Sequence, residues 1–165
     1  MRCVVIVLLV TIVLDAKPQN PAVELSGDIL QLAIPAVAFS STLFWPEQDN
    51  KGTWEVVKAG AVSTIATYGI KYLVNKERPN GDPYAFPSGH TSRAFTGAAF
   101  IQRKYGWKYG APAYLLATYT GWSRVYVNKH DYWDVLGGAA VGIASGLLFT
   151  KPFNQRKPTQ VYFWR

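Results

Sequence analysis

The chain has 165 residues, of which 49% are hydrophobic, 15% are aromatic and 16% are charged, and its formal net charge is +7. This length predicts a single domain, and the lone cysteine, Cys3, excludes an intrachain disulfide and any metal site built from cysteines. The composition is apolar for a small soluble protein, although a mean hydropathy of +0.02 is low for a protein made only of membrane spans. The excess of positive charge indicates either attraction to a membrane surface or an anionic substrate, and we expect no nucleic-acid partner.

Residues 1–16 have the pattern of a secretory signal peptide. A positively charged start precedes the uncharged run Cys3–Leu14, and the small residue Ala16 stands before a polar stretch. The alternative is a short first membrane helix. We favour the signal peptide because the run is well short of the ~20 residues that a membrane span needs.

The rest of the chain predicts helices joined by polar loops. Lys17–Asp28 is polar, contains prolines and predicts a linker. Beyond it, apolar runs and apolar residues one helical turn apart predict these helices: Ile29–Trp45, Thr53–Val74, a helix that starts at Ser88 and ends near Gly106, Pro112–Val127 and His130–Thr150.

No run shows the alternation of a half-buried strand, so the predicted fold class is all-α, a helical bundle of about five to six helices if the N-terminal segment is included. The domain would occupy residues 17–150, and residues 151–165 would form a basic tail.

The last predicted helix carries a face of small residues. Gly138, Gly142 and Gly146 recur every four residues, so another helix can approach its backbone closely. A membrane bundle and a soluble bundle could both use such a face.

The stretch from Lys71 to Asp134 contains three clusters of residues suited to phosphate chemistry, and both histidines of the chain lie in it. The clusters are Lys71 with Arg78-Pro79, then Pro87-Ser88-Gly89-His90, then Ser123-Arg124 with His130 and Asp134. Phosphoryl transfer needs fixed cations, backbone N–H donors, a nucleophile and a proton donor, and these clusters supply all four.

Lys71, Arg78 and Arg124 could hold the charged oxygens of a phosphoryl group. Ser88 and Gly89 stand where a helix begins, so free backbone N–H groups and the positive end of the helix dipole favour an anion there. Each residue also has a structural interpretation, because helix-end cations can extend to the surface and Ser88 can simply cap the helix.

His130 and Asp134 are four residues apart, so they share one face if the helix already includes them. Asp134 could accept the proton of one ring nitrogen and leave the other free to attack phosphorus. An ordinary pair at a helix end is the alternative, and Asp131 could compete for the same ring. We expect no metal, because the neighbouring cations would repel a dication from this histidine and aspartate.

The order and spacing of the clusters, Lys-x6-Arg-Pro, Pro-Ser-Gly-His and Ser-Arg-x5-His-x3-Asp, resemble the type 2 phosphatidic acid phosphatase family. That family also includes bacterial acid phosphatases and vanadium haloperoxidases, and the resemblance covers about residues 54–150. It implies a helical bundle with the clusters at one end. From the three cations and the lack of a metal-ligand set we expect no cofactor and inhibition by vanadate. The resemblance assigns the nucleophile that forms a phosphohistidine to His130, and it leaves His90 as the general acid.

The expected function is therefore a metal-independent phosphatase acting on a lipid phosphate or diphosphate at a bacterial-type cytoplasmic membrane. By resemblance the candidate substrates are phosphatidic acid, phosphatidylglycerol phosphate, undecaprenyl diphosphate and lipid A phosphates. The alternatives are a secreted soluble acid phosphatase of broad specificity, a vanadium haloperoxidase and a non-enzymatic membrane protein.

If the predicted helices span a membrane, the three clusters lie on one side of it. The opposite side receives Arg103, Lys104, Lys108 and the basic tail. Because basic residues favour the cytoplasmic side, the clusters would face the periplasm or the exterior. Against this, the apolar segment Ala94–Gln102 is much shorter than a span, which keeps the soluble alternative open.

Overall fold

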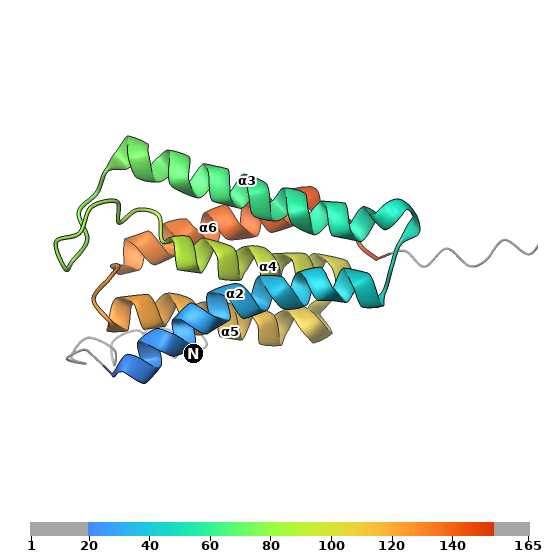
Figure 1. The fold of residues 1–165 in the computed structure, drawn as a ribbon, viewed down its shortest axis with the longest axis horizontal. Helices are drawn as coiled ribbons and strands as arrows, with labels where there is room; N and C mark the ends of the chain where they lie inside the picture. Colours follow the sequence, from blue (N-terminus) through green and yellow to red (C-terminus); the bar gives the residue numbers. More distant parts are fainter. Residues whose placement is uncertain (1–19, 154–165) are drawn as a thin grey trace, which may run out of the picture.

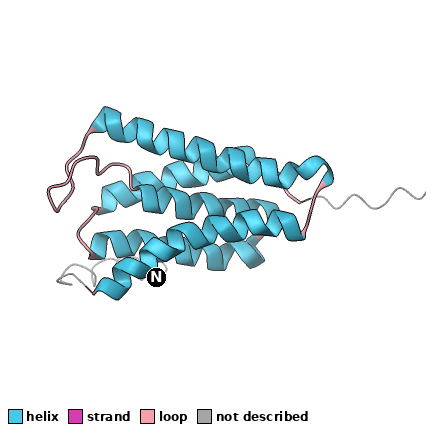
Figure 2. Cartoon of the chain, viewed as in Figure 1, coloured by secondary structure: helices cyan, strands magenta, loops and turns pink. Residues whose placement is uncertain are grey.

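The structure, a computed structural model, describes residues 20–153, and its regular elements are all helical. In chain order they are α2 (Pro21–Phe44), the short 3-10 helix η1 (Gln48–Asn50), α3 (Lys51–Val74), α4 (Gly89–Tyr105), α5 (Trp107–Tyr126) and α6 (Tyr132–Phe149). Figure 2 shows no strand in this part of the chain, which confirms the predicted all-α class. The predicted signal peptide and most of the basic tail lie outside the described residues.

Helix α2 begins at Pro21, so the prediction of a linker over Lys17–Asp28 is wrong for most of that stretch. The Asn20 side chain accepts a hydrogen bond from the Ala22 N–H at 3.0 Å. Proline at the first helical position and asparagine as the cap are a common helix start, because proline lacks the N–H that would be unsatisfied there. The additional turns carry acidic residues that reach the site described below.

Helix α4 lies at the centre of the bundle and contacts α2, α3, α5 and α6 (Figure 1). Its buried side chains include the small residues Ala94, Ala98 and Ala99 as well as Phe95 and Phe100. It has 17 residues, which confirms the predicted helix that starts at Ser88 and ends near Gly106. At 1.5 Å per residue its length is about 25 Å, and among the described helices only α2 and α6 are long and apolar enough to cross a membrane.

The glycine face of α6 packs directly on α4, as predicted. A Cβ atom added to Gly138 would lie 2.5 Å from the Ser88 carbonyl oxygen, and one added to Gly142 would lie 2.4 Å from the Ser92 carbonyl oxygen. No side chain fits at these distances, so the two backbones are in contact. This contact places the first turns of α4 and α6 side by side.

The outer surface of the bundle is apolar over large areas. Helices α2 and α6 are long and apolar enough to cross a membrane by length and composition. Large side chains such as Leu32, Ile65, Leu115 and Leu148 are exposed on different helices. Lipid accommodates such a surface, whereas water disfavours extended apolar patches.

Candidate active site

The three clusters meet at one end of the bundle, at the left in Figure 1, where α3 ends, α4 and α6 begin and α5 ends. A cavity of about 460 Å³ opens there, and its lining includes Lys71, Arg78, His90, Arg124 and His130. Residues up to 62 positions apart therefore share one cavity, since Tyr68 and His130 both line it. The bundle brings the clusters together as expected.

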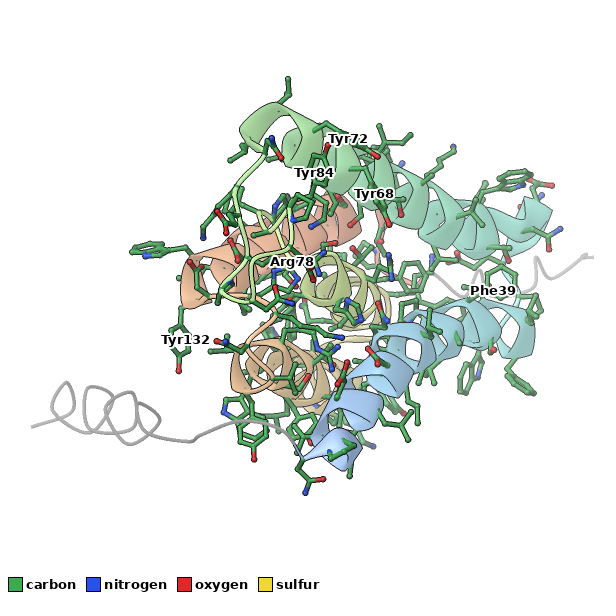
Figure 3. The ribbon with its side chains drawn as sticks, turned by 60° about the vertical axis from the view of Figure 1, so that its left-hand side comes forward. Phe39, Tyr68, Tyr72, Arg78, Tyr84 and Tyr132 are labelled. Carbon is green, nitrogen blue, oxygen red and sulfur yellow. The ribbon has the colours of Figure 1, made fainter. Side chains whose placement is uncertain are left out.

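Lys71 lies in the last turn of α3 and is buried rather than extended to the surface. Its Nζ donates to the Tyr84 carbonyl oxygen at 2.7 Å. The loop between α3 and α4 thus folds over the lysine. Figure 3 shows Tyr68 and Tyr72 of α3 on the same side of the site as Tyr84, and the rings of Tyr72 and Tyr84 make an edge-on contact with centroids 5.1 Å apart.

Arg78, in the same loop, has a hydrogen-bond donor that lacks an acceptor among the described residues. Its Nη1 faces Asp82 at 3.8 Å, and its buried Nε has no hydrogen-bond partner among the described residues. A buried N–H without an acceptor costs free energy, so such groups in native proteins usually meet a ligand or an ordered water. An anion in the cavity would satisfy it.

Ser88 and Gly89 suit different roles among those predicted for them, which are helix capping and anion binding. Ser88 is fully buried, caps α4 and donates its backbone N–H to the Asp134 carbonyl oxygen at 2.8 Å. Its hydroxyl oxygen lies 3.0 Å from the Thr91 hydroxyl. The cavity lining includes Gly89, the first residue of α4, but not Ser88. The structure thus supports capping for Ser88 and places Gly89 beside the cavity.

Arg124 is fully buried and bonded to α2. Its Nη1 donates to Asp28 Oδ1 at 2.7 Å, and its Nη2 donates to the Glu24 carbonyl oxygen at 2.6 Å. The same Asp28 oxygen lies 2.8 Å from His90 Nε2. Asp28 therefore joins Arg124 to His90, a link that sequence reasoning missed because it placed Asp28 in a linker. The Asn20-Pro21 helix start was the signal that could have found it.

His130 precedes α6 rather than lying within it, so its pairing with Asp134 does not come from a shared helical face. Its Nδ1 lies 3.4 Å from Asp134 Oδ2. Asp131 does not compete for the ring, because Asp131 is the N-cap: its side chain accepts from the Asp134 N–H at 3.0 Å, and the Asp134 side chain accepts from the Asp131 N–H at 3.1 Å. This reciprocal capping fixes Asp134 beneath the imidazole.

Burial lowers the pKa of His130, and the nearby charges of Lys71 and Arg78 lower it further, against the opposing effect of Asp134. The ring is therefore neutral at neutral pH. A neutral ring that donates its Nδ1 proton to Asp134 keeps a lone pair on Nε2. That lone pair is what a nucleophile requires.

Lys76 is a further residue that sequence reasoning missed. Its Nζ binds Asp131, and it donates to Asp134 Oδ1 at 2.7 Å. Burial alone would lower the pKa of Lys76, but the hydrogen bonds to the two aspartates outweigh it and raise the pKa. The ammonium group thus balances the charge of the fully buried Asp134. No spacing rule singles this lysine out, because its partners lie 55 and 58 residues away.

Within residues 20–153, no group of three or more His, Cys, Asp or Glu side chains is arranged to hold a metal ion. The charged groups around the cavity are mainly cations.

The family model of the PAP2 superfamily matches residues 4–158. The chain belongs to this superfamily. This confirms the resemblance drawn from the three clusters, and it covers more of the chain than the clusters themselves.

Curated relatives are lipid phosphatases by name. Lipid A 1-phosphatase of Helicobacter pylori is 31% identical over 133 residues, which cover 75% of this chain and 65% of that protein, so the chain spans just under two thirds of that relative. Lipid A 4'-phosphatase of the same species is 28% identical over 159 residues, covering 87% of this chain and 79% of that protein. Undecaprenyl-diphosphatase BcrC of Bacillus subtilis is 31% identical over 139 residues, covering 73% and 69%.

Two solved structures share the fold. LpxE of Aquifex aeolicus superposes with a TM-score of 0.63 at 24% identity, covering 79% of this chain and 86% of that one. A transmembrane PAP2-type phosphatidylglycerolphosphate phosphatase of Bacillus subtilis gives a TM-score of 0.61 at 22% identity, covering 79% and 76%. The relatives favour a lipid phosphatase over the secreted soluble acid phosphatase considered from the sequence.

The Lys76 contacts predict a loss of stability on substitution. Lys76→Met should lower the free energy of unfolding by about 1–3 kcal/mol, because it leaves the buried Asp134 carboxylate short of a partner. The midpoint of thermal unfolding in detergent micelles measures it. Lys51→Met is the matched control, since Lys51 faces only Asp49 at 4.0 Å with both side chains exposed, and it should change stability by at most about 0.5 kcal/mol. Equal midpoints for the two variants would contradict the assigned role of Lys76.

Proposed function

We propose that this chain is a lipid phosphatase that cleaves a phosphate or diphosphate ester through a phosphohistidine on His130. One observation carries the proposal: His130, oriented by the buried Asp134, opens into the same cavity as Lys71, Arg78, Arg124 and His90. A nucleophile, a proton donor and cations around one cavity suit phosphoryl transfer.

The cations would bind the phosphoryl oxygens. Lys71 is held in place by the loop carbonyl groups, and the Nε of Arg78 offers a donor that no other described residue uses. Donors fixed before the reaction stabilise the charge of the transition state without reorganising. Vanadate adopts a similar five-coordinate geometry, so we propose that it binds the same cations and inhibits.

In the first step His130 Nε2 attacks phosphorus, and the bond from phosphorus to the leaving oxygen breaks. Asp134 accepts the Nδ1 proton in a hydrogen bond and stabilises the positive charge that the ring acquires. His90 in its protonated form, with Asp28 as the charge partner, gives a proton to the leaving oxygen, and the neutral ring then removes a proton from the water that cleaves the phosphohistidine. Asp28, bonded to His90 Nε2, would orient that ring.

The lipid character of the substrate is supported by the relatives and by the surface of the bundle. The named activities of the relatives are on lipid A and undecaprenyl diphosphate. Helix α2, whose Asp28 contacts His90 and Arg124, and helix α6, which begins just after His130, are apolar enough to sit in lipid. A lipid held in the membrane could therefore present its phosphate to the cavity from the bilayer surface.

Replacement of His130 tests the nucleophile. His130→Ala should abolish turnover and the covalent label that radioactive phosphate leaves on histidine when the reaction is quenched. Asp134→Asn should lower turnover by roughly 10³–10⁴-fold, because the ring loses its orientation and charge partner. A label of unchanged intensity in His130→Ala would place the nucleophile on another residue.

Replacement of His90 tests the general acid. An alkyl phosphate has a poor leaving group that needs a proton, whereas a nitrophenyl phosphate leaves easily. His90→Ala should therefore slow alkyl phosphates by about 10²–10⁴-fold and nitrophenyl phosphate far less. The inhibition constant of vanadate is the control, because a variant with intact phosphate-binding cations keeps it. Equal losses on both substrates would instead assign His90 to phosphate binding.

We also propose that the cavity faces the periplasm or the exterior. Arg103 and Lys108 are exposed at the opposite end of the bundle. Lys104, which the sequence also predicts on the cytoplasmic side, is buried there and paired with Glu47 and Glu55. The exposed pair still favours a cytoplasmic location for that end.

Cysteine labelling tests this orientation. In a Cys3→Ser background, Asp82→Cys at the rim of the cavity should react with an impermeant maleimide on intact cells. Lys108→Cys should react only after the membrane is made permeable. The reverse pattern would place the cavity on the cytoplasmic side.

A further inference from the structure

Arg93 is a cation of the cavity that belongs to none of the three clusters. It lies in the first turns of α4 and lines the same cavity as Lys71 and His130. A Cβ atom added to Gly89 would lie 3.8 Å from Arg93 Nη2 and 3.9 Å from Lys71 Cε. The guanidinium group of Arg93 and the stem of Lys71 therefore flank Gly89 on the cavity wall.

Among the described residues, no carboxylate pairs with Arg93. Three other basic residues of the cavity do face carboxylates, whereas Lys71 donates to a loop carbonyl group: Arg124 pairs with Asp28, Lys129 with Glu24, and Arg78 lies 3.8 Å from Asp82. Across residues 20–153, the partners of Arg93 are neutral: its Nη1 donates to Gln31 Oε1 at 2.5 Å, and its Nη2 lies 3.4 Å from the Tyr68 hydroxyl oxygen.

These two contacts orient the side chain without using its charge. Gln31 is buried in α2 and holds one edge of the guanidinium group. Nη2 carries two N–H groups and the Tyr68 hydroxyl can accept only one of them, so Nη2 keeps a donor for a ligand. An arginine that is fixed by neutral acceptors and open to a cavity is suited to binding an anion.

The position of Arg93 on α4 indicates which part of a substrate its side chain would contact. Arg93 follows His90 by three residues, so the two side chains are neighbours on one face of the helix. His90 is the proposed acid for the leaving group, whereas His130 attacks from α6. Arg93 therefore stands beside the leaving group rather than behind the attacking nitrogen.

We propose that Arg93 binds a second phosphate group on the leaving side, and that the preferred substrates are lipid diphosphates. This inference rests on the proposed phosphatase function. His130 attacks the terminal phosphorus, its bond to the bridging oxygen breaks, and the lipid monophosphate leaves with the electron pair on that oxygen. His90 supplies the proton, water then cleaves the phosphohistidine, and inorganic phosphate is released. Arg93 balances the negative charge of the departing lipid monophosphate. A lipid monophosphate substrate would instead release an alcohol, which carries no such charge.

The test compares two substrates with the same chain, farnesyl diphosphate and farnesyl monophosphate, in detergent micelles. Arg93→Gln should lower kcat/KM for the diphosphate by about 10–100-fold, the range for one charge-assisted hydrogen bond, and change the monophosphate by less than about 3-fold. Arg93→Lys should recover part of the loss. Arg103→Gln, the same change at an exposed position near the other end of α4, is the matched control and should alter neither substrate.

A second comparison separates two kinds of substrate that carry a second phosphate group: a lipid diphosphate and a lipid with an additional phosphodiester. Phosphatidylglycerol phosphate carries its second phosphate beyond a glycerol unit, whereas phosphatidic acid has none. If Arg93→Gln lowers kcat/KM for phosphatidylglycerol phosphate but not for farnesyl diphosphate, the diphosphate assignment is overturned in favour of a phosphodiester contact.

The remaining outcomes are also decisive. Equal losses on farnesyl diphosphate and monophosphate would make Arg93 part of the general phosphate site, and no loss on either would remove it from substrate binding; both overturn the inference and leave the phosphatase function intact. A wild-type protein that cleaves none of these lipids would overturn the proposed function itself.

Discussion

The site depends on the close contact between the backbones of α4 and α6. Because Gly138 and Gly142 have no side chain, the carbonyl groups of Ser88 and Ser92 can approach α6 to distances that no Cβ would permit. The Ser88 N–H then donates to the Asp134 carbonyl oxygen at 2.8 Å. The start of α4 and Asp134, whose carboxylate lies 3.4 Å from His130 Nδ1, are held together by helix packing, not by a flexible loop.

Around this contact the protein buries several charged groups and supplies each with a partner. Arg124 and Asp134 are both fully buried. Arg124 meets Asp28, and Asp134 meets Lys76 and His130. Burying an ion pair contributes little net stability, but removing one partner is costly, so such pairs hold their members in fixed positions. Fixed positions are what electrostatic stabilisation of a transition state requires.

Helix α2 supports the side of the cavity that holds His90, the proposed acid. Glu24, Asp28 and Gln31 follow one another at helical spacing, so they lie on one face of α2. The Glu24 carbonyl group and Asp28 hold Arg124, Asp28 holds His90, and Gln31 holds Arg93. His130, the proposed nucleophile, has a separate support in the capping residues of α6 and Lys76. The proposed nucleophile and the proposed acid are thus oriented by different elements.

Much of this protein could be predicted from its sequence alone. The helical class, the glycine face of the last helix and the three clusters rest on periodicity and short spacings, which are local properties of the chain. Their meeting at one end of a bundle was implied by the family resemblance and agrees with the observed cavity. Local signals failed where two interpretations competed: the polar, proline-containing start of α2 resembles a linker, and His130 lies just before the helix that was expected to contain it.

Only the tertiary structure decided which charges are paired and which remain available for a substrate. Asp28 and Arg124 are 96 residues apart, Lys76 and Asp134 are 58 apart, and Arg93 finds Gln31 at a separation of 62. Such pairs form because helices distant in the chain pack against one another, and no local pattern records that packing. The sequence by itself determined the chemical groups and their order, whereas the packing of α2, α4 and α6 determined that Asp28 contacts His90, that Lys76 contacts Asp134, and that Arg93 meets only neutral partners within residues 20–153.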